Sequence, residues 1–225
     1  MTEPSERRAD VTRQHILAAA AHQFAHRPYS QVSLDDILAE ARVTKGAMYF
    51  HFRSKHALAT AIIDEQGELA KRAANEVFGR RLSGFETVVD LWYLIAVQDV
   101  SDVMARAGMN LLEEIGRAGV MKAKLLNQWL DGFALILRQA VDEGDVIDQV
   151  SPDAASRLLV SLYMGLRQTS ELGDPHRFFG DLEQALLLLL PSLVSSEQIG
   201  YMTQFIKRRT NLASSTPPLP PFDSA

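Results

Sequence analysis

The segment TKGAMYFHFRSK, residues 44–55, carries ammonium, phenol and imidazole groups that a short helix would present together. A lysine can donate hydrogen bonds to guanine O6 and N7 in the major groove of DNA. Small residues beside it let the backbone approach the base edges. We therefore predict that Lys45 reads a base and that Gly46 and Ala47 allow this close approach.

Aromatic and basic side chains further along the segment extend this prediction. Met48 and Phe52 are four residues apart and should point inward together, which leaves Tyr49 and His51 facing phosphates or base edges. Lys55 follows at the start of the next helix, where an ammonium group can hold a phosphate. Each group could instead be an ordinary surface side chain, but their combination in one short segment favours DNA contact.

The elements around this segment have the order of a helix-turn-helix unit. Ser33 followed by Asp36 resembles a capping box, and Thr44 and Ser54 are suited to cap the next two helices. The expected elements are a helix over 34–41, a turn over 41–44, a helix over 44–52 and a helix from 55 to about 79.

Helices are expected on both sides of this unit. Apolar residues recur at helical spacing over residues 9–26, and Arg27-Pro28 should end that helix. Ser151-Pro152-Asp153 combines an N-cap, a proline at the first helical position and an acid, which predicts another helix start. The later helices are expected over residues 85–100, 102–116, 120–143, 152–171, 176–190 and 196–210.

Large apolar residues in the body are candidates for lining a cavity, with ordinary core packing as the alternative for each. Trp129 is the strongest candidate, because it lies mid-helix beside Asn127 and Gln128 and its indole N–H needs a partner if it is buried. A ligand oxygen would supply that partner. The candidates are Trp92, Tyr93, Met104, Met109, Trp129, Phe133, Tyr163 and Met164.

Charge is distributed unevenly along the 225 residues. Residues 1–56 hold eight lysines and arginines against six aspartates and glutamates, whereas residues 57–225 hold fifteen against twenty-two. The net charge of −5 therefore combines +2 in the DNA-reading segment with −7 in the body. Positive charge is kept where DNA contact is predicted.

Several functional classes are disfavoured. Adjacent acids such as Asp35-Asp36, Asp64-Glu65 and Glu113-Glu114 point to different helix faces, His176 is alone in the body, and no glycine-rich phosphate loop occurs. We expect no enzyme, no catalytic residue, no metal and no cofactor. A purely architectural DNA-binding protein without a pocket stays an alternative.

Composition also bears on location. The chain has no cysteine, which excludes disulfides and is compatible with the cytoplasm. Its N-terminus lacks the apolar region of a signal peptide, and Ala185–Val194 is too short to span a bilayer. We expect a cytoplasmic, nucleoid-associated protein without membrane contact.

The run VTKGAMYFHFRSKHALA resembles the signature of the TetR family of transcriptional regulators, and the resemblance covers roughly residues 10–60. It implies an all-α homodimer with an N-terminal helix-turn-helix DNA-binding domain and a larger helical domain for ligand binding and dimerisation. Phe50 falls at an aromatic position that partly serves packing. The implied DNA-binding residues are Ser33, Thr44, Lys45, Gly46, Ala47, Tyr49, His51 and Lys55.

The body resembles the γ-butyrolactone autoregulator receptors of actinomycetes in the runs GFETVVDLWYLIAVQDVSDVMARAG, LLNQWLDGFALILRQAVDEGDV and SPDAASRLLVSLYMGLRQTSE. The resemblance implies that Trp129 lies in a ligand pocket and that Gln66 touches the ligand. Tyr163 and Arg167 stand where smaller polar residues are usual, which favours a butenolide or furan carboxylic acid as alternatives to the lactone. The ligand-binding residues so predicted are Trp129, Gln66, Val88, Leu91, Trp92, Met109, Leu126, Phe133, Tyr163 and Arg167.

These resemblances predict a repressor that binds a pseudo-palindromic operator as a homodimer and leaves it when a small lipophilic hormone binds. They imply control of antibiotic or secondary-metabolite genes in quorum sensing. A pseudo-receptor that responds to an antibiotic is the alternative, which the acidic pI near 5.7 disfavours. The predicted domains are a helix-turn-helix domain over 9–56, a connecting helix over 57–80, a ligand-binding and dimerisation domain over 81–210 and a disordered tail over 211–225.

Overall fold

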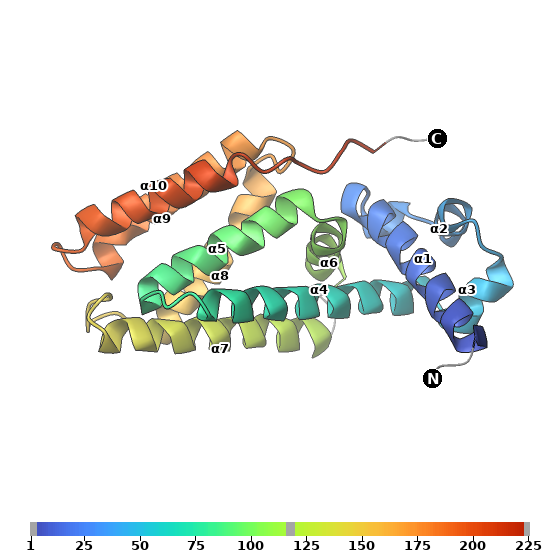
Figure 1. The fold of residues 1–225 in the computed structure, drawn as a ribbon, viewed down its shortest axis with the longest axis horizontal. Helices are drawn as coiled ribbons and strands as arrows, with labels where there is room; N and C mark the ends of the chain where they lie inside the picture. The colour runs from blue at the N-terminus through green and yellow to red at the C-terminus, as the bar shows by residue number, and fades with distance from the viewer. Residues whose placement is uncertain (1–3, 116–119, 223–225) are drawn as a thin grey trace. The chain divides into compact units, whose positions relative to one another are not determined.

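The computed structural model describes residues 4–115 and 120–222, and the side chains of residues 9–115 and 126–222. Regular structure in this part of the chain is helical, apart from an isolated bridge between Val146 and Val194 (Figure 1). The predicted all-α fold class is confirmed. The elements are α1 Pro4–His26, the 3-10 turn η1 Tyr29–Gln31, α2 Leu34–Ala41, α3 Lys45–His51, α4 Lys55–Phe78, α5 Gly84–Ser101, α6 Val103–Glu114, α7 Val120–Asp142, α8 Pro152–Thr169, α9 Pro175–Leu193 and α10 Ile199–Ala213.

Side-chain caps fix several helix starts, as the sequence predicted. The Ser33 hydroxyl accepts from the Asp36 N–H at 3.1 Å, and the Ser54 hydroxyl accepts from the Ala57 N–H at 3.0 Å. Ser151 caps α8 in the same way, with Pro152 at its first position. These caps satisfy N–H groups that a helix leaves without partners at its N-terminus.

The tail expected to be disordered is partly ordered, and the first helix begins earlier than predicted. α1 begins at Pro4 and not near residue 9, while residues 1–3 lie outside the described part. At the other end, Asn211–Ala213 complete α10. The segment Pro217–Phe222 has no regular structure but contacts α1, a partner that its composition does not reveal. Residues 223–225 and Gly116, the expected end of the sixth helix, lie outside the described residues.

The described residues form two compact units, and their boundaries fall inside α4 and α7. The first contains the described residues within Met1–Leu69, Asp102–Lys122 and Pro220–Ala225, and the second those within Ala70–Ser101 and Ala123–Leu219. The predicted functional domain boundaries stay a prediction. The compact units differ from them in one respect, because α6 belongs to the first unit, where it packs along α1.

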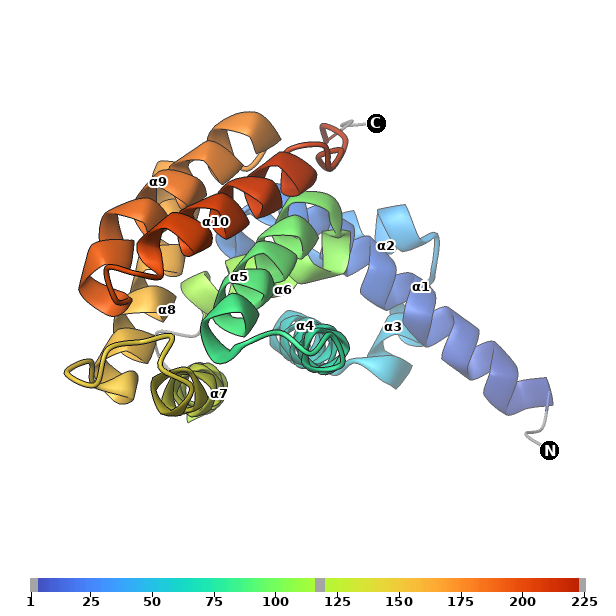
Figure 2. The same ribbon diagram turned by 60° about the vertical axis from the view of Figure 1, so that its left-hand side comes forward.

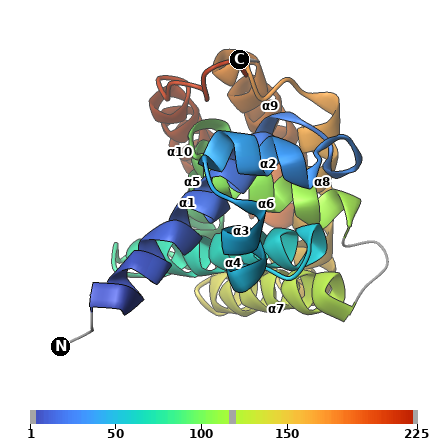
Figure 3. The same cartoon turned by 90° about the vertical axis from the view of Figure 1, so that its right-hand side faces the viewer.

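The first unit is built around α1, which packs against α2, α3 and α6 (Figure 3). The Asn110 side-chain amide in α6 donates to the Phe24 carbonyl at 3.0 Å, which joins α6 to the end of α1. At Gly108 of α6 the approach to α4 is close, because an added Cβ would lie 2.4 Å from the Gln66 Cβ. The buried apolar side chains at the centre include Ile16, Phe24, Ile37, Met48, Leu58 and Ile62.

In the second unit α9 and α10 lie side by side, and α10 also packs on α5 (Figure 2). The buried Asp90 carboxylate of α5 accepts from Arg80 at 2.8 Å and pairs with Arg209 of α10 at 2.7 Å. These two ion pairs compensate the burial of the carboxylate and join the end of α4, α5 and α10. In the described residues, no helix is long and apolar enough to cross a membrane.

We predict that Gly84→Ala destabilises the protein by about 1–3 kcal/mol, because overpacking forces neighbouring atoms to move. A Cβ at this position would lie 2.5 Å from the backbone nitrogen of Ala140, and backbone cannot shift easily. The measurement is urea unfolding followed by circular dichroism.

Gly132→Ala on α7 is the matched control, since an added Cβ there would meet nothing within 4 Å. In a helix interior this change should raise stability by up to about 1 kcal/mol. Equal unfolding midpoints for the two variants would contradict the close packing of α5 on α7.

Candidate functional site

Two sets of side chains are candidates for function, one on the exposed face of α3 and one in a pocket between α5, α7 and α8. They belong to different compact units.

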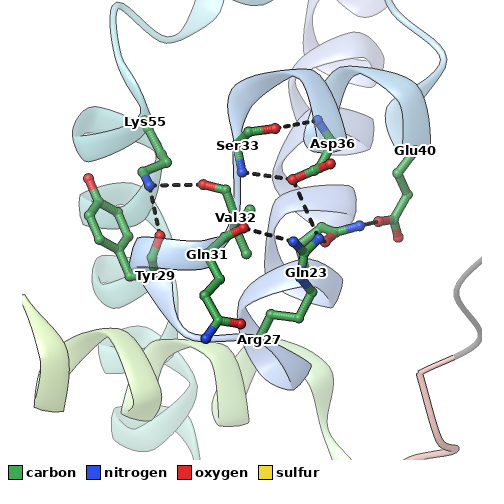
Figure 4. Close-up of polar contacts among 9 residues, drawn as sticks. All are labelled: Gln23, Arg27, Tyr29, Gln31, Val32, Ser33, Asp36, Glu40 and Lys55. Atoms are coloured by element: carbon green, nitrogen blue, oxygen red, sulfur yellow. Dashed lines mark hydrogen bonds and ion pairs between the residues drawn. The ribbon is translucent and has the colours of Figure 1, made fainter.

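The loop between α1 and α2 is tied to the start of α4 by Lys55 (Figure 4). The Lys55 ammonium donates to the Tyr29 carbonyl at 2.7 Å and to the Val32 carbonyl at 2.9 Å. It also lies 4.0 Å from the centre of the Tyr29 ring, within the range of a cation–π interaction. Lys55 therefore holds the chain segment that leads into α2.

Gln23 of α1 and Arg27, which follows the helix, hold the other side of this loop (Figure 4). Arg27 donates to the Gln23 side-chain oxygen at 2.8 Å and to the Gln31 carbonyl at 2.7 Å. The Gln23 amide in turn donates to Glu40 of α2 at 2.6 Å. This chain of hydrogen bonds fixes α2 on α1.

α2 begins with the predicted capping box and ends in a left-handed residue. The Ser33 N–H donates to Asp36 at 2.8 Å, and this hydrogen bond is the main cause that lowers the pKa of Asp36. The capping carboxylate therefore stays charged to a lower pH than an ordinary aspartate does. Arg42 ends the helix with φ of 53°, and the following turn leads directly into α3.

α3 presents a mixed polar and aromatic surface, as the sequence predicted. Thr44 caps it by accepting from the Ala47 N–H at 3.2 Å, and Met48 and Phe52 are buried. Lys45 is exposed, and Tyr49 is 45% exposed. His51 is half-buried, and its ring meets that of Phe50 edge-on.

Small residues on α3 have no packing role that explains them. A Cβ at Gly46 would meet only the Thr44 hydroxyl, at 4.0 Å. Ala47 is half-buried and gives its N–H to the cap. Packing within the chain therefore does not require a glycine at Gly46, and its contact with DNA stays a prediction.

Two predicted DNA-binding residues have structural roles, and Phe50 differs from its predicted packing role. Ser33 uses its hydroxyl as a helix cap, and Lys55 turns inward to two carbonyls, so both have structural roles whether or not they touch phosphate. Phe50 is 79% exposed, so the expected packing role is wrong. Its position, two residues from both Met48 and Phe52, was the signal that it lies off the buried face.

The pocket lies in the second unit and brings together four predicted ligand residues, Trp92, Trp129, Phe133 and Tyr163. Ile95 and Val160 complete the lining and were missed. Their helical spacing was available as a signal, because Ile95 is three residues after Trp92 and Val160 is three before Tyr163. Among the described residues that line it, none is charged.

The pocket is small. Its cavity volume is about 10 Å³, roughly what one water molecule requires. A ligand of more than a few atoms needs more space than the pocket has in this structure.

The other predicted ligand residues lie elsewhere. Val88 and Leu91 are buried on α5 and Leu126 is half-buried on α7, all outside the lining. Gln66 and Met109 belong to the first unit, where the buried Gln66 side-chain oxygen has no hydrogen-bond partner among the described residues. These residues were predicted from helix periodicity or from the resemblance to the receptors. Neither signal shows which residues line the pocket.

Arg167 is buried beside the pocket and is paired with Asp99 of α5. Its Nη2 donates to Asp99 Oδ1 at 3.0 Å and its Nε to Oδ2. Tyr163, whose side chain lines the pocket, donates its hydroxyl to the same carboxylate at 3.1 Å. The predicted acid-binding arginine is thus already matched by a carboxylate of the chain.

Residues 16–62, which include α2 and α3, match the protein family described as "Bacterial regulatory proteins, tetR family". The A-factor receptor protein of Streptomyces griseus is 33% identical over 197 residues, which cover 87% of this chain and 68% of the receptor. The chain belongs to the TetR family. This TetR-family chain is a DNA-binding transcriptional repressor and not an enzyme, as predicted from its sequence.

Solved structures of other TetR-family proteins share the fold along nearly the whole chain. A crystal structure of a γ-butyrolactone receptor, an ArpA-like protein, has a TM-score of 0.79 and 29% identity, and covers 91% of this chain and 99% of its own. The TetR-family protein CprB from Streptomyces coelicolor, in complex with its operator sequence, has a TM-score of 0.77, 29% identity and the same coverage. The predicted arrangement of a helix-turn-helix domain followed by a larger helical domain is confirmed.

We predict that Lys55→Met lowers the stability of the protein without DNA by about 1–2 kcal/mol, because two carbonyls lose a charged donor. The methionine keeps most of the aliphatic packing. Thermal unfolding of the purified variant is the measurement. A wild-type melting temperature, with loss of DNA affinity alone, would show that Lys55 acts as a phosphate contact and not as a loop anchor.

Proposed function

We propose that the protein represses transcription as a homodimer on a pseudo-palindromic operator and is released by a small lipophilic hormone, a γ-butyrolactone or a related butenolide or furan. The observation that carries the proposal is the small apolar pocket, which is lined by both tryptophans of the chain. Similarity to the A-factor receptor and to a γ-butyrolactone receptor supports the ligand class. The genes so controlled are proposed to be those of antibiotic or secondary metabolism, in a cytoplasmic setting.

DNA reading is assigned to the exposed face of α3. A helix-turn-helix places its second helix in the major groove, with the N-terminal residues of that helix at the base edges. Lys45 is at this end and exposed, and Tyr49 and Phe50 extend the same surface. Similarity to CprB, which was solved on its operator, supports this use of the helix.

Dimerisation is assigned to α8 and α9, which pack on each other within the second unit. The leucine run in α9 is divided between two environments: Leu186 and Leu190 are buried in the unit, whereas Leu188 is 82% exposed. Leu158 of α8 is 46% exposed. Exposed leucines on two adjacent helices are suited to an isologous interface with a second copy.

Release is proposed to follow from the size of the pocket. A ligand stabilises an arrangement in which α5, α7 and α8 lie further apart. The fraction of molecules in the closed arrangement then falls, and DNA binding weakens because it requires that arrangement. α4 continues from the first unit into the second without a break in the helix. α6 lies close against Gln66 of α4 at Gly108, and this contact is proposed to pass a movement of α6 to α4.

The test is fluorescence anisotropy of the protein on its own upstream DNA, titrated with a lipophilic extract of the producing culture. Release by extract and not by solvent is the expected result. DNA binding that no extract disturbs would oppose hormone control and favour a pseudo-receptor or an architectural protein.

Trp129→Ala is expected to bind the operator with wild-type affinity but to lose release by the extract, because it removes a half-buried wall of the pocket. Leu135→Ala is the control, since Leu135 is 64% exposed on the same helix and lies outside the lining. A Trp129→Ala protein that folds and is still released normally would refute the pocket assignment.

Lys45→Ala is expected to weaken binding to the operator by about 1–3 kcal/mol with little change on unrelated DNA, if Lys45 reads a guanine. Lys207→Ala removes the same charge from an exposed position on α10 and serves as the control. Anisotropy on both DNAs gives the two affinities. An equal loss on operator and unrelated DNA would make Lys45 a phosphate contact.

A further inference from the structure

The buried cluster of Asp99, Arg167 and Tyr163 lies at one end of the pocket in the second unit. The side chains of Asp99 and Arg167 are each 1% exposed, and the guanidinium meets the carboxylate through two of its nitrogens. A guanidinium and a carboxylate joined by two hydrogen bonds have a defined geometry, and together they carry no net charge.

Tyr163 connects this ion pair to the pocket. Its ring lies 6.2 Å from that of Trp92, centre to centre, and both residues line the pocket. Its hydroxyl donates to Asp99. A ligand that fills the pocket therefore meets, at this end, a phenol whose proton is directed to a carboxylate.

An anionic ligand is disfavoured in these surroundings. It would bring a second negative charge toward Asp99 in a buried region, and the positive charge of Arg167 is already matched by that residue. Loss of water from an ion that gains no new partner is unfavourable. An uncharged ligand with the same carbon skeleton avoids this loss while keeping the apolar contacts with the two tryptophans.

We propose that Asp99 determines specificity: by neutralising Arg167 it makes the pocket select an uncharged lactone or butenolide and reject the corresponding carboxylate. The proposal rests on the proposed function, because it takes the pocket as the ligand site. It reverses the sequence-based expectation that Arg167 favours a carboxylic acid.

Intrinsic tryptophan fluorescence is a direct probe of this site, because the chain has two tryptophans and both line the pocket. The probes are γ-decalactone, its ring-opened carboxylate 4-hydroxydecanoate, and the methyl ester of that acid as a neutral open-chain control. At neutral pH the lactone and the ester are expected to bind at least about tenfold more tightly than the carboxylate. Carboxylate binding as tight as that of the lactone would overturn the proposal.

Asp99→Asn is expected to shift the ratio of lactone to carboxylate affinity toward the carboxylate by at least about tenfold, because it leaves Arg167 charged without its carboxylate. Asp153→Asn is the matched control, since it removes the same charge from an exposed position on α8 and should leave the ratio unchanged. An unchanged ratio in a folded Asp99→Asn protein would overturn the proposal.

Tyr163→Phe provides a second variant if Asp99→Asn does not fold. It removes the phenol but keeps the ion pair, so discrimination against the carboxylate should persist. Loss of discrimination in this variant would show that the phenol, and not the ion pair, rejects the acid.

Operator release, followed by anisotropy with the same probes, separates the two proposals. Lactone binding without DNA release supports the role of Asp99 but refutes hormone-controlled repression. Release by the carboxylate alone supports repression and refutes the role of Asp99. No fluorescence change with any of the three probes refutes the pocket assignment and with it the role of Asp99, whereas release of the operator by extract would then still support hormone-controlled repression.

Discussion

The ammonium group of Lys55 ties the start of α4 to the two carbonyls that lead into α2, and the presentation of α3 depends on that tie. α3 has seven residues, too few to be stable as an isolated helix. Its position is therefore set by the elements on either side, α2 and α4. Met48 anchors its inner face, and Lys55 and Arg27 fix the surrounding chain.

The second unit uses buried charge in a comparable way, at two places along α5. Asp90 joins α5 to Arg80 and Arg209, and Asp99 joins it to Arg167 of α8. Removing one partner of such a pair leaves a buried charge without compensation, which is strongly destabilising. α5 is therefore held by ion pairs at two positions, and the pocket residues Trp92 and Ile95 lie between them. Under the proposed function, a ligand would act on this restrained helix or on its neighbours α7 and α8.

Local signals in the sequence predicted most helix starts, because a cap or a proline acts within a few residues of its own position. The capping box of α2 and the exposed face of α3 follow from such signals. Partners distant in the chain could not be predicted: Arg167 and Asp99 are 68 positions apart, and periodicity shows that a residue faces inward without showing what it meets. For the same reason Gln66 and Met109 were assigned to a pocket whose lining lies in the other unit, and Lys55 was predicted to hold a phosphate without its two carbonyl partners being foreseen.

The unbroken passage of α4 between the two units has a consequence for how the chain can vary. Each residue of an α-helix turns the following chain by about 100° and advances it by about 1.5 Å. A single insertion near Leu69 and Ala70 would therefore turn the residues of α4 beyond it by about 100° and change which of them are buried, whereas exposed side chains on the same stretch can change with less effect. Natural variants should differ in the composition of α4 and agree in its length. The length of α4 is in this sense a stricter constraint than its composition.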